Sequence, residues 1–249
     1  MTILDKLQGL FPVHYRFGDI LLINADCMDV MAHIDCKHFQ LSCVDPPYMV
    51  NMSGGKSPKN GFKGRSHWDK MKTWDFERPS KEYFHELFRV SVNQIICGAN
   101  YFTEHLPPSM GWVFWYKMQD NFSFSDGELI FTSFDCKTRI FKYGRGMESG
   151  FAPGGCVGPN IHSTQKPVGL YRFLFHHYAK PGQLILDTHG GSFSSAIAAH
   201  YAGLRFVGVE LDQEYFDAAV KRFKQATRQM TLFGPEKEKR AKHDQDKLI

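Results

Sequence analysis

The four residues Asp45-Pro46-Pro47-Tyr48 are the segment of this sequence with the clearest chemical meaning. An ionised aspartate only accepts hydrogen bonds, and the carbonyl of Pro46 is an acceptor on a residue that has no N–H of its own. Two such acceptors can hold both N–H groups of an amine, and the two prolines stiffen the turn. The pair suits the exocyclic amine of adenine or cytosine, which is a poor nucleophile because its lone pair is delocalised into the ring.

Tyr48 follows the two acceptors and offers a ring on which such a base can stack after it leaves a duplex. Stacking of this kind is worth about 1 to 3 kcal/mol per base, which offsets part of the cost of unstacking. No metal and no covalent enzyme intermediate is needed if a cofactor carries a good leaving group. We therefore assign catalytic roles to Asp45, Pro46, Pro47 and Tyr48.

A second group of residues has the spacing of a nucleotide-binding unit. Asp187 ends an apolar run, Gly190-Gly191-Ser192 turns the chain into a helical pattern, and Glu210 ends the next apolar run. Glycines let the backbone approach a ligand closely, and an acid at a strand tip can accept hydrogen bonds from both hydroxyls of a ribose. An ordinary turn with a solvated Glu210 would give the same pattern, so this unit alone does not establish a nucleotide-binding site.

Apolar runs and helical patterns indicate the elements that position these residues. Strands are expected at 20–24, 40–44, 94–98, 112–116, 128–133, 137–142, 184–186 and 205–209, and helices at 27–34, 80–91, 167–178, 193–202 and 212–228, the last with Asp212 as N-cap. This alternation predicts an α/β fold with a doubly wound, mostly parallel sheet. Such sheets bind ligands beyond the carboxyl ends of their strands, so Asp45, Asp187 and Glu210 should share one edge.

Length and composition predict a single domain over residues 1–233 and a charged, disordered tail over 234–249. The apolar runs are too short for a membrane helix and the N-terminus lacks a secretory apolar segment, so we expect a cytoplasmic protein. The six cysteines have no CxxC spacing and the histidines form no HExxH pattern. We therefore expect neither a disulfide framework nor a metal site.

With His162-Ser163-Thr164-Gln165-Lys166-Pro167, these motifs resemble those of the β-class DNA amino-methyltransferases, which methylate adenine N6 or cytosine N4. In that family DPPY precedes the cofactor-binding strand, as it does here, and Ala25-Asp26-Cys27 resembles the short acidic motif near the cofactor adenine. The motifs span most of the chain. The resemblance implies a Rossmann-like methyltransferase fold with an irregular target-recognition region, from a bacterium or a phage.

The resemblance also implies S-adenosyl-L-methionine as cofactor and a division of labour within the site. Asp26 would lie at the cofactor adenine, Glu210 at its ribose and Lys166 near its carboxylate. The full set expected to bind the cofactor is Asp26, Cys27, Asp45, Lys166, Asp187, His189, Gly191, Ser192 and Glu210.

The implied partner is double-stranded DNA with one base flipped out, and the family also allows a homodimer. No long recognition domain is present, so sequence preference should come from segments 49–76 and 143–162, the first of which mixes basic residues with glycines and aromatic rings. A solvated surface loop has the same composition. The expected DNA contacts are Lys56, Lys59, Lys63, Arg65 and Arg145.

The sequence departs from the family at one point. The family usually has D-P-F-x-G-S-G, whereas this chain reads Asp187-Thr188-His189-Gly190-Gly191-Ser192-Phe193 and has Phe193 where a last glycine is expected. This change could reduce cofactor affinity, although the flat ring of His189 could still cover the ligand. We expect an altered site that works.

Adenine N6 is the expected target, because an aspartate in the first position of DPPY favours adenine. Cytosine N4 is the first alternative, since the same acceptors serve either amine, and an RNA adenine is the second. A catalytically silent nucleic-acid-binding relative is the third, motivated by Thr188, His189 and Phe193.

Overall fold

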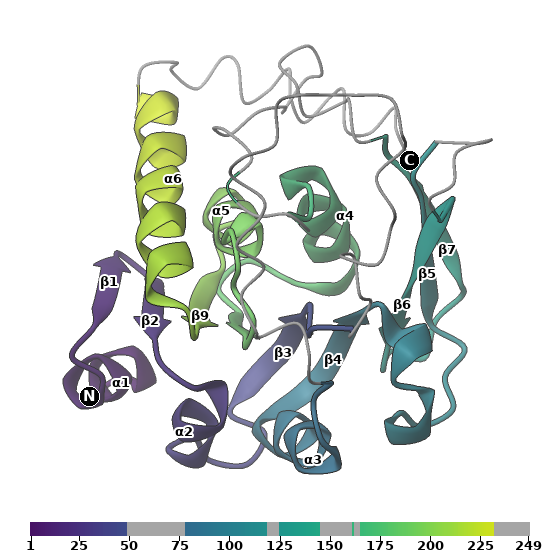
Figure 1. Ribbon diagram of the computed structural model, residues 1–249, viewed down its shortest axis with the longest axis horizontal. Helices are drawn as coiled ribbons and strands as arrows, with labels where there is room; N and C mark the ends of the chain where they lie inside the picture. The colour runs from purple at the N-terminus through teal and green to yellow at the C-terminus, as the bar shows by residue number, and fades with distance from the viewer. Residues whose placement is uncertain (49–77, 119–124, 145–160, 162–164, 232–249) are drawn as a thin grey trace, which may run out of the picture.

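The computed structural model describes residues 1–48, 78–118, 125–144, 161 and 165–231 (Figure 1). Within these residues, nine strands form one sheet in the order β1-β2-β9-β8-β3-β4-β6-β5-β7. The strands are β1 (His14–Phe17), β2 (Ile20–Asn24), β3 (Phe39–Val44), β4 (Ser91–Cys97), β5 (Trp112–Tyr116), β6 (Gly127–Thr132), β7 (Arg139–Lys142), β8 (Leu184–Asp187) and β9 (Arg205–Glu210). The helices are α1 (Ile3–Leu10), α2 (Cys27–Ala32), α3 (Lys81–Val90), α4 (Val168–Tyr178), α5 (Ser194–Tyr201) and α6 (Gln213–Thr231), with 3-10 turns η3 (Ala99–Tyr101) and η4 (Thr103–His105).

The centre of the sheet is parallel. Four adjacent pairs are parallel: β2 with β9, β9 with β8, β8 with β3, and β3 with β4. Strand β6 is antiparallel to both β4 and β5. At the far ends, β1 runs antiparallel to β2 and β7 runs parallel to β5. The predicted α/β fold with a mostly parallel sheet is confirmed.

Helices cover both faces of this sheet. Helices α4, α5 and α6 lie on one face and α1, α2 and α3 on the other (Figure 1). The run Ile20 to Ile23 in β2 is buried along its whole length, with alternate side chains entering the two opposite cores. Burial on both faces explains why the central strands appear in the sequence as unbroken apolar runs rather than as alternating ones.

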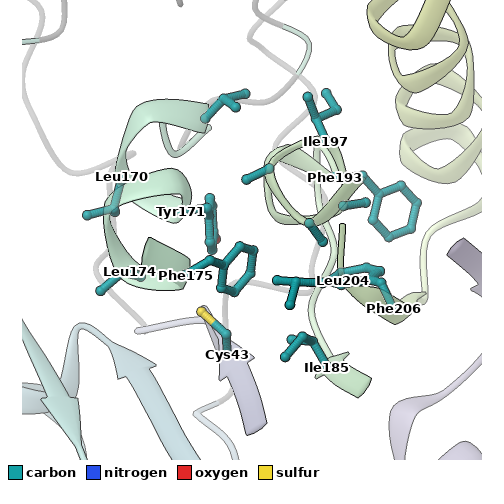
Figure 2. Close-up of a cluster of buried hydrophobic side chains, with 14 of the residues drawn as sticks. Cys43, Leu170, Tyr171, Leu174, Phe175, Ile185, Phe193, Ile197, Leu204 and Phe206 are labelled. Carbon is teal, nitrogen blue, oxygen red and sulfur yellow. The ribbon is translucent and has the colours of Figure 1, made fainter. Parts of the chain in front are cut away.

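The core beneath the carboxyl ends of β3 and β8 is aromatic. Cys43 and Ile185 point from the sheet toward Tyr171 and Phe175 of α4, and Phe193 packs in the same cluster beside α5 (Figure 2). This packing fixes the start of α5 against the sheet, and with it the turn that leads into that helix.

Every strand and helix expected from the sequence is present, with bounds shifted by at most three residues. Asp212 caps α6 as predicted, because its Oδ1 accepts hydrogen bonds from the amides of Glu214 and Tyr215. The sequence analysis missed α1, β1 and the turns η3 and η4. Helix α1 is only eight residues long, and β1 is a short, half-buried edge strand, so neither carries a strong period.

No helix in the described part of the chain is long and apolar enough to span a membrane. The predicted tail at 234–249 lies outside the described residues.

Candidate active site

The acids expected at one sheet edge do lie there. Asp45 follows β3, Asp187 ends β8 and Glu210 ends β9, and these strands are parallel neighbours. Strand β2 is parallel to β9, with Asn24 in register with Glu210, so Asp26 also lies beyond the carboxyl end of a central strand. The sequence prediction of a common edge is confirmed.

Tyr48 is held by contacts on three sides. Its hydroxyl donates to Asp45 Oδ1, and its ring stacks on Tyr101 with centroids 5.1 Å apart. The ring also lies against Gly98, where an added Cβ would overlap it, and Gly98 has a φ of +60°. Only glycine suits that position without strain. The end of β4 thus supports the ring that was expected to receive a base.

Lys166 lies beside Asp45. Its Nζ is 3.0 Å from Asp45 Oδ1, 3.0 Å from the Tyr48 hydroxyl and 3.0 Å from Glu128 Oε2. Glu128 comes from β6, and its Oε1 is 2.5 Å from Nζ of Lys117, the residue that follows β5. We call Lys117, Glu128, Lys166 and Asp45 the charge cluster.

The charge cluster is largely buried, and burial and pairing act on it in opposite directions. Burial alone would lower the pKa of Lys166, but Asp45 and Glu128 raise it, so the ammonium stays charged. Burial raises the pKa of Asp45, and Lys166 opposes that effect. Burial would also raise the pKa of Glu128, but Lys166 and Lys117 together lower it. Three ion-pair contacts therefore join two cations and two acids.

The second half of the site is the glycine turn, residues 187–193. Glu210 Oε2 accepts from the amide of Gly191 at 2.7 Å, and its Oε1 accepts from the amide of Asp212 at 2.9 Å. The amide of Gly190 donates to the Val209 carbonyl at 2.7 Å. Hydrogen bonds to the end of β9 thus hold the turn in place.

Asp187 supports the glycine turn from below. The side chain is fully buried, its Oδ1 accepts from the His189 amide at 3.1 Å and its Oδ2 accepts from the Ser195 hydroxyl. Burial raises the pKa of this carboxyl to about 7, against the effect of those two hydrogen bonds. Asp187 therefore acts in the described structure as an internal brace between β8 and α5.

Phe193, which stands where the family motif has a glycine, has a left-handed backbone conformation. Its φ is +51°, in the left-handed region, and its side chain is fully buried. The ring lies against Gly190 and Gly208 and contacts Phe216 edge-on at 6.1 Å. A left-handed residue other than glycine costs about 1 to 2 kcal/mol, and burying a phenylalanine side chain contributes about 1.5 to 3 kcal/mol. Burial of the Phe193 ring in the core can therefore offset the strain of its left-handed backbone.

The other two departures from the family motif bind each other and α3. The Thr188 hydroxyl lies 2.7 Å from the Tyr83 hydroxyl and 2.9 Å from His189 Nδ1, and the His189 ring meets the Tyr83 ring edge-on. Burial lowers the pKa of His189 to about 4, so the imidazole is neutral near pH 7. Tyr83 thus fixes the ring that was expected to cover a ligand.

A buried arginine braces the far end of the glycine turn. Arg222 reaches from α6, and its Nη1 donates to the Ser192 carbonyl at 2.8 Å and to the Ser194 hydroxyl at 3.1 Å. Both Arg222 and Ser192 are buried. A charged donor in this position holds the start of α5 against α6.

Asp26 and Cys27 stand at the start of α2. Asp26 caps the helix, because its Oδ1 accepts from the Met28 amide at 2.8 Å. Burial, and then the charge of Asp26, raise the pKa of Cys27 to about 12. Cys27 is therefore a neutral thiol, which suits packing against a ligand rather than nucleophilic chemistry.

The expected DNA contacts Lys56, Lys59, Lys63, Arg65 and Arg145 lie outside the described residues, as do His162, Ser163 and Thr164. Gln165 is described, and its side-chain oxygen accepts from the Ile161 amide at 3.2 Å. In the described part of the chain, no group of histidine, cysteine or acidic residues could hold a metal ion.

Sequence reasoning missed Glu128, Lys117, Tyr83, Arg222 and Tyr101. Glu128 could have been noticed as a carboxylate within an otherwise uncharged strand, and Lys117 as the cation that ends the apolar run Trp112–Tyr116. Nothing in the spacing of Tyr83, Arg222 or Tyr101 indicates that they reach the site.

Comparisons with known proteins find similarity to DNA methylases. Residues 105–221 match the family model of the N6 and N4 DNA methylases, a stretch that contains Lys166, the glycine turn and Glu210. YubD of Escherichia coli (strain K12), a methylase by its name, is 26% identical over 230 residues, which cover 84% of this chain and 92% of YubD. The DNA adenine methyltransferase YhdJ of the same organism is 34% identical over 61 residues, or 24% of this chain and 21% of YhdJ.

Solved structures share the fold. A DNA modification methylase, by its name, of Thermus thermophilus, solved with S-adenosyl-L-methionine, superposes with a TM-score of 0.51 at 16% identity, over 82% of this chain and 95% of that one. The cytosine-N4-specific PvuII DNA methyltransferase gives a TM-score of 0.57 at 10% identity, over 86% of this chain and 92% of that one.

The chain therefore has the fold of the DNA methyltransferases. The family match over residues 105–221 and the similarity to YubD over most of both chains show that the chain is similar to the N6/N4 DNA methylases, and they confirm the resemblance drawn from the sequence.

Proposed function

We propose that this protein transfers a methyl group from S-adenosyl-L-methionine to the N6 amine of a flipped-out adenine in DNA. The observation that carries the proposal is the placement of two motifs on neighbouring parallel strands. The Asp45–Tyr48 turn follows β3, the glycine turn follows β8, and both lie at the carboxyl edge of the sheet. A base held by the first turn and a cofactor held by the second would meet across that edge.

The residues of the glycine turn fit such a cofactor. At Gly191 the backbone has a φ of +50°, and an added Cβ would meet no atom within 4 Å, so the turn is open on that side. Glu210 and Asp26 offer carboxylates beyond β9 and β2, as ribose and adenine recognition would require. Cys27, Asp187, His189 and Ser192 complete the proposed cofactor site. When bound, S-adenosyl-L-methionine supplies an electrophilic methyl group on a sulfonium centre.

The residues around Asp45 then need only hold and orient the amine. Asp45 and the Pro46 carbonyl accept the two N–H groups, which leaves the nitrogen lone pair free to face the methyl group. Tyr48 supports the base by stacking. Positioning of this kind, together with acceptors that stabilise the positive charge that develops on the nitrogen, supplies the catalysis.

Two observations favour adenine as the target. DPPY begins with aspartate, and the stretch of 61 residues similar to YhdJ belongs to a protein named as a DNA adenine methyltransferase. The likeness to the cytosine-N4-specific PvuII enzyme concerns the fold, which serves both amines. Contacts of Lys56, Lys59, Lys63, Arg65 and Arg145 with DNA phosphates are part of this proposal.

Expression of the chain in a bacterial strain without DNA amino-methylation tests the proposal. The genomic DNA is digested to nucleosides for mass spectrometry, and modified positions are mapped by single-molecule sequencing. We expect N6-methyladenine in a fixed sequence context, and none in cells that express the Asp45→Ala variant. N4-methylcytosine in its place would move the target to cytosine, and unmodified DNA from cells with soluble protein would contradict the proposal.

A further inference from the structure

The charge cluster is built from four separate segments of the chain. Asp45 follows β3, Lys117 follows β5, Glu128 lies in β6 and Lys166 precedes α4. The exposed fractions of their side chains are 17%, 8%, 17% and 5%. Burying four charges is costly even when they are paired, so an arrangement of this kind is weak evidence for stability and invites a functional explanation.

The contacts of Lys166 leave its ammonium little freedom. An ammonium group has three donors, and here three oxygens of Asp45, Tyr48 and Glu128 each lie 3.0 Å from Nζ. Without Glu128 the ammonium would lose one of its three partners and the charge that draws it toward β6. Lys117 holds Glu128 from the other side at 2.5 Å.

The consequence for Asp45 is that its two oxygens differ. Oδ1 receives both the Tyr48 hydroxyl and Lys166, whereas Oδ2 has no hydrogen-bond or ion-pair partner among the described residues. A carboxylate anchored through one oxygen presents the other in a fixed direction. Oδ2 is thus the oxygen left to accept from an amine.

We propose that Lys166 and Glu128 are positioning residues for Asp45. Glu128 holds the Lys166 ammonium on Oδ1, and this contact keeps Oδ2 aimed at an N–H of the target amine. The inference rests on the proposed function and refines it, because it assigns Lys166 to the half of the site that holds the base rather than to the cofactor carboxylate expected from the sequence.

The ammonium also keeps Asp45 an acceptor. A protonated carboxyl would present a donor to the amine. Burial and the charge of Glu128 raise the pKa of Asp45, whereas Lys166 and the hydrogen bond from Tyr48 lower it. The titratable groups that face Asp45 are Cys43 of β3, Cys97 of β4, Glu128 of β6, Asp187 of β8, Tyr171 of α4, and Tyr48 and Tyr83. Lys166 is the cation in direct contact with Asp45 among the described residues.

The first test compares the pH dependence of methyl transfer in several variants of the full chain. Unmethylated genomic DNA and S-adenosyl-L-methionine are the substrates, and Lys180→Met, at an exposed lysine, is the control. We expect Lys166→Met to lower kcat about a hundredfold at neutral pH and to move the acidic limb of the profile to higher pH. The dissociation constant for S-adenosyl-L-methionine, measured by calorimetry, should change by no more than about twofold.

Two further variants distinguish a loss of Asp45 positioning from a general loss of folded structure. Lys166→Arg keeps the charge and should recover part of kcat with an acidic limb near that of the wild type. Glu128→Gln should lower kcat about tenfold without moving the acidic limb upward, because it removes a negative charge that itself raises the pKa of Asp45. Weaker cofactor binding by Lys166→Met with an unmoved acidic limb would overturn the inference.

A second readout needs neither DNA nor activity. The titration of the Asp45 carboxyl is followed by carbon-13 NMR and assigned by the loss of its signal in Asp45→Asn. We expect the titration of Asp45 to lie at higher pH in Lys166→Met than in the wild type, and an unchanged titration would overturn the inference even in an active enzyme. A shifted titration in a chain that methylates no DNA would support the role of Lys166 on Asp45 and contradict the proposed function.

Discussion

The base-facing half of the site is held through its side chains, whereas the glycine turn is held through its backbone amides and carbonyls. Asp45 is fixed by a hydroxyl and an ammonium that come from Tyr48 and Lys166. The glycine turn is fixed by the amides of Gly190 and Gly191, which bond to Val209 and Glu210 at the end of β9. Ion pairs between side chains thus position one half of the site, and hydrogen bonds to the amides and carbonyls of the turn position the other.

This difference explains which half tolerates sequence change. In the glycine turn, Phe193 replaces a glycine and still has a φ of +51°, because the backbone hydrogen bonds set the path. In the charge cluster, removing Lys166 leaves the buried Asp45 without its cation, and loss of a partner from a buried ion pair typically costs about 3 to 5 kcal/mol. We therefore expect substitutions in the base-facing half to have the larger functional effects.

The largest effect is expected for Asp45→Ala. The variant loses the acceptor that the amine needs most as it reacts, so kcat should fall about a thousandfold while the affinity for S-adenosyl-L-methionine stays nearly constant. Single-turnover methylation and calorimetry measure the two quantities. The matched control is Asp29→Ala, at an aspartate in the first turn of α2. Equal losses of kcat and cofactor affinity would contradict the assignment of Asp45 to the base-facing half of the site.

An intermediate effect is expected for Glu210→Ala. A carboxylate that bonds to a ribose contributes about 1.5 to 3 kcal/mol, so cofactor affinity should weaken about tenfold or more, and kcat at saturating cofactor should change little. Calorimetric titration checks the affinity, with Asp217→Ala, at an exposed residue of α6, as control. Unchanged affinity would show that Glu210 does not contribute to cofactor binding.

The smallest functional effect is expected for Phe193→Gly, which restores the residue usual in the family. Deleting the buried ring should cost about 3 to 5 kcal/mol of unfolding free energy, and the matched variant Phe193→Ala should be about 1 kcal/mol less stable still, because alanine keeps the strain of the left-handed backbone. Urea unfolding measures both values. Cofactor affinity should stay within about twofold of wild type, and a large gain on restoring glycine would show that Phe193 impairs the site.

The sequence predicted the glycine turn more completely than the base-facing half. Residues 183 to 228 lie close together along the chain, so the period of the strands and the positions of Asp187, Gly191, Glu210 and Asp212 were sufficient to predict the unit. Asp45 and its neighbouring prolines were also recognised, because the four-residue motif is contiguous.

The partners of Asp45 could not be predicted in the same way. Glu128 and Lys117 reach the site because β6 lies antiparallel beside β4 and β5 lies antiparallel beside β6. The periodicity of the sequence does not indicate that order of strands. Lys166 was recognised through its motif, but its contact with Asp45 depends on the position at which α4 begins above the sheet. Side-chain contacts between segments that are far apart in the sequence can be identified only from the three-dimensional structure.

A crystal structure with sinefungin tests the central claim most directly, because this analogue carries an amine where S-adenosyl-L-methionine carries its methyl group. We predict that its ribose hydroxyls bond to Glu210 and that its amine points across the sheet edge toward Asp45, within about 5 Å of the carboxylate. An analogue bound elsewhere, or bound at the glycine turn with its amine facing away from Asp45, would contradict the account.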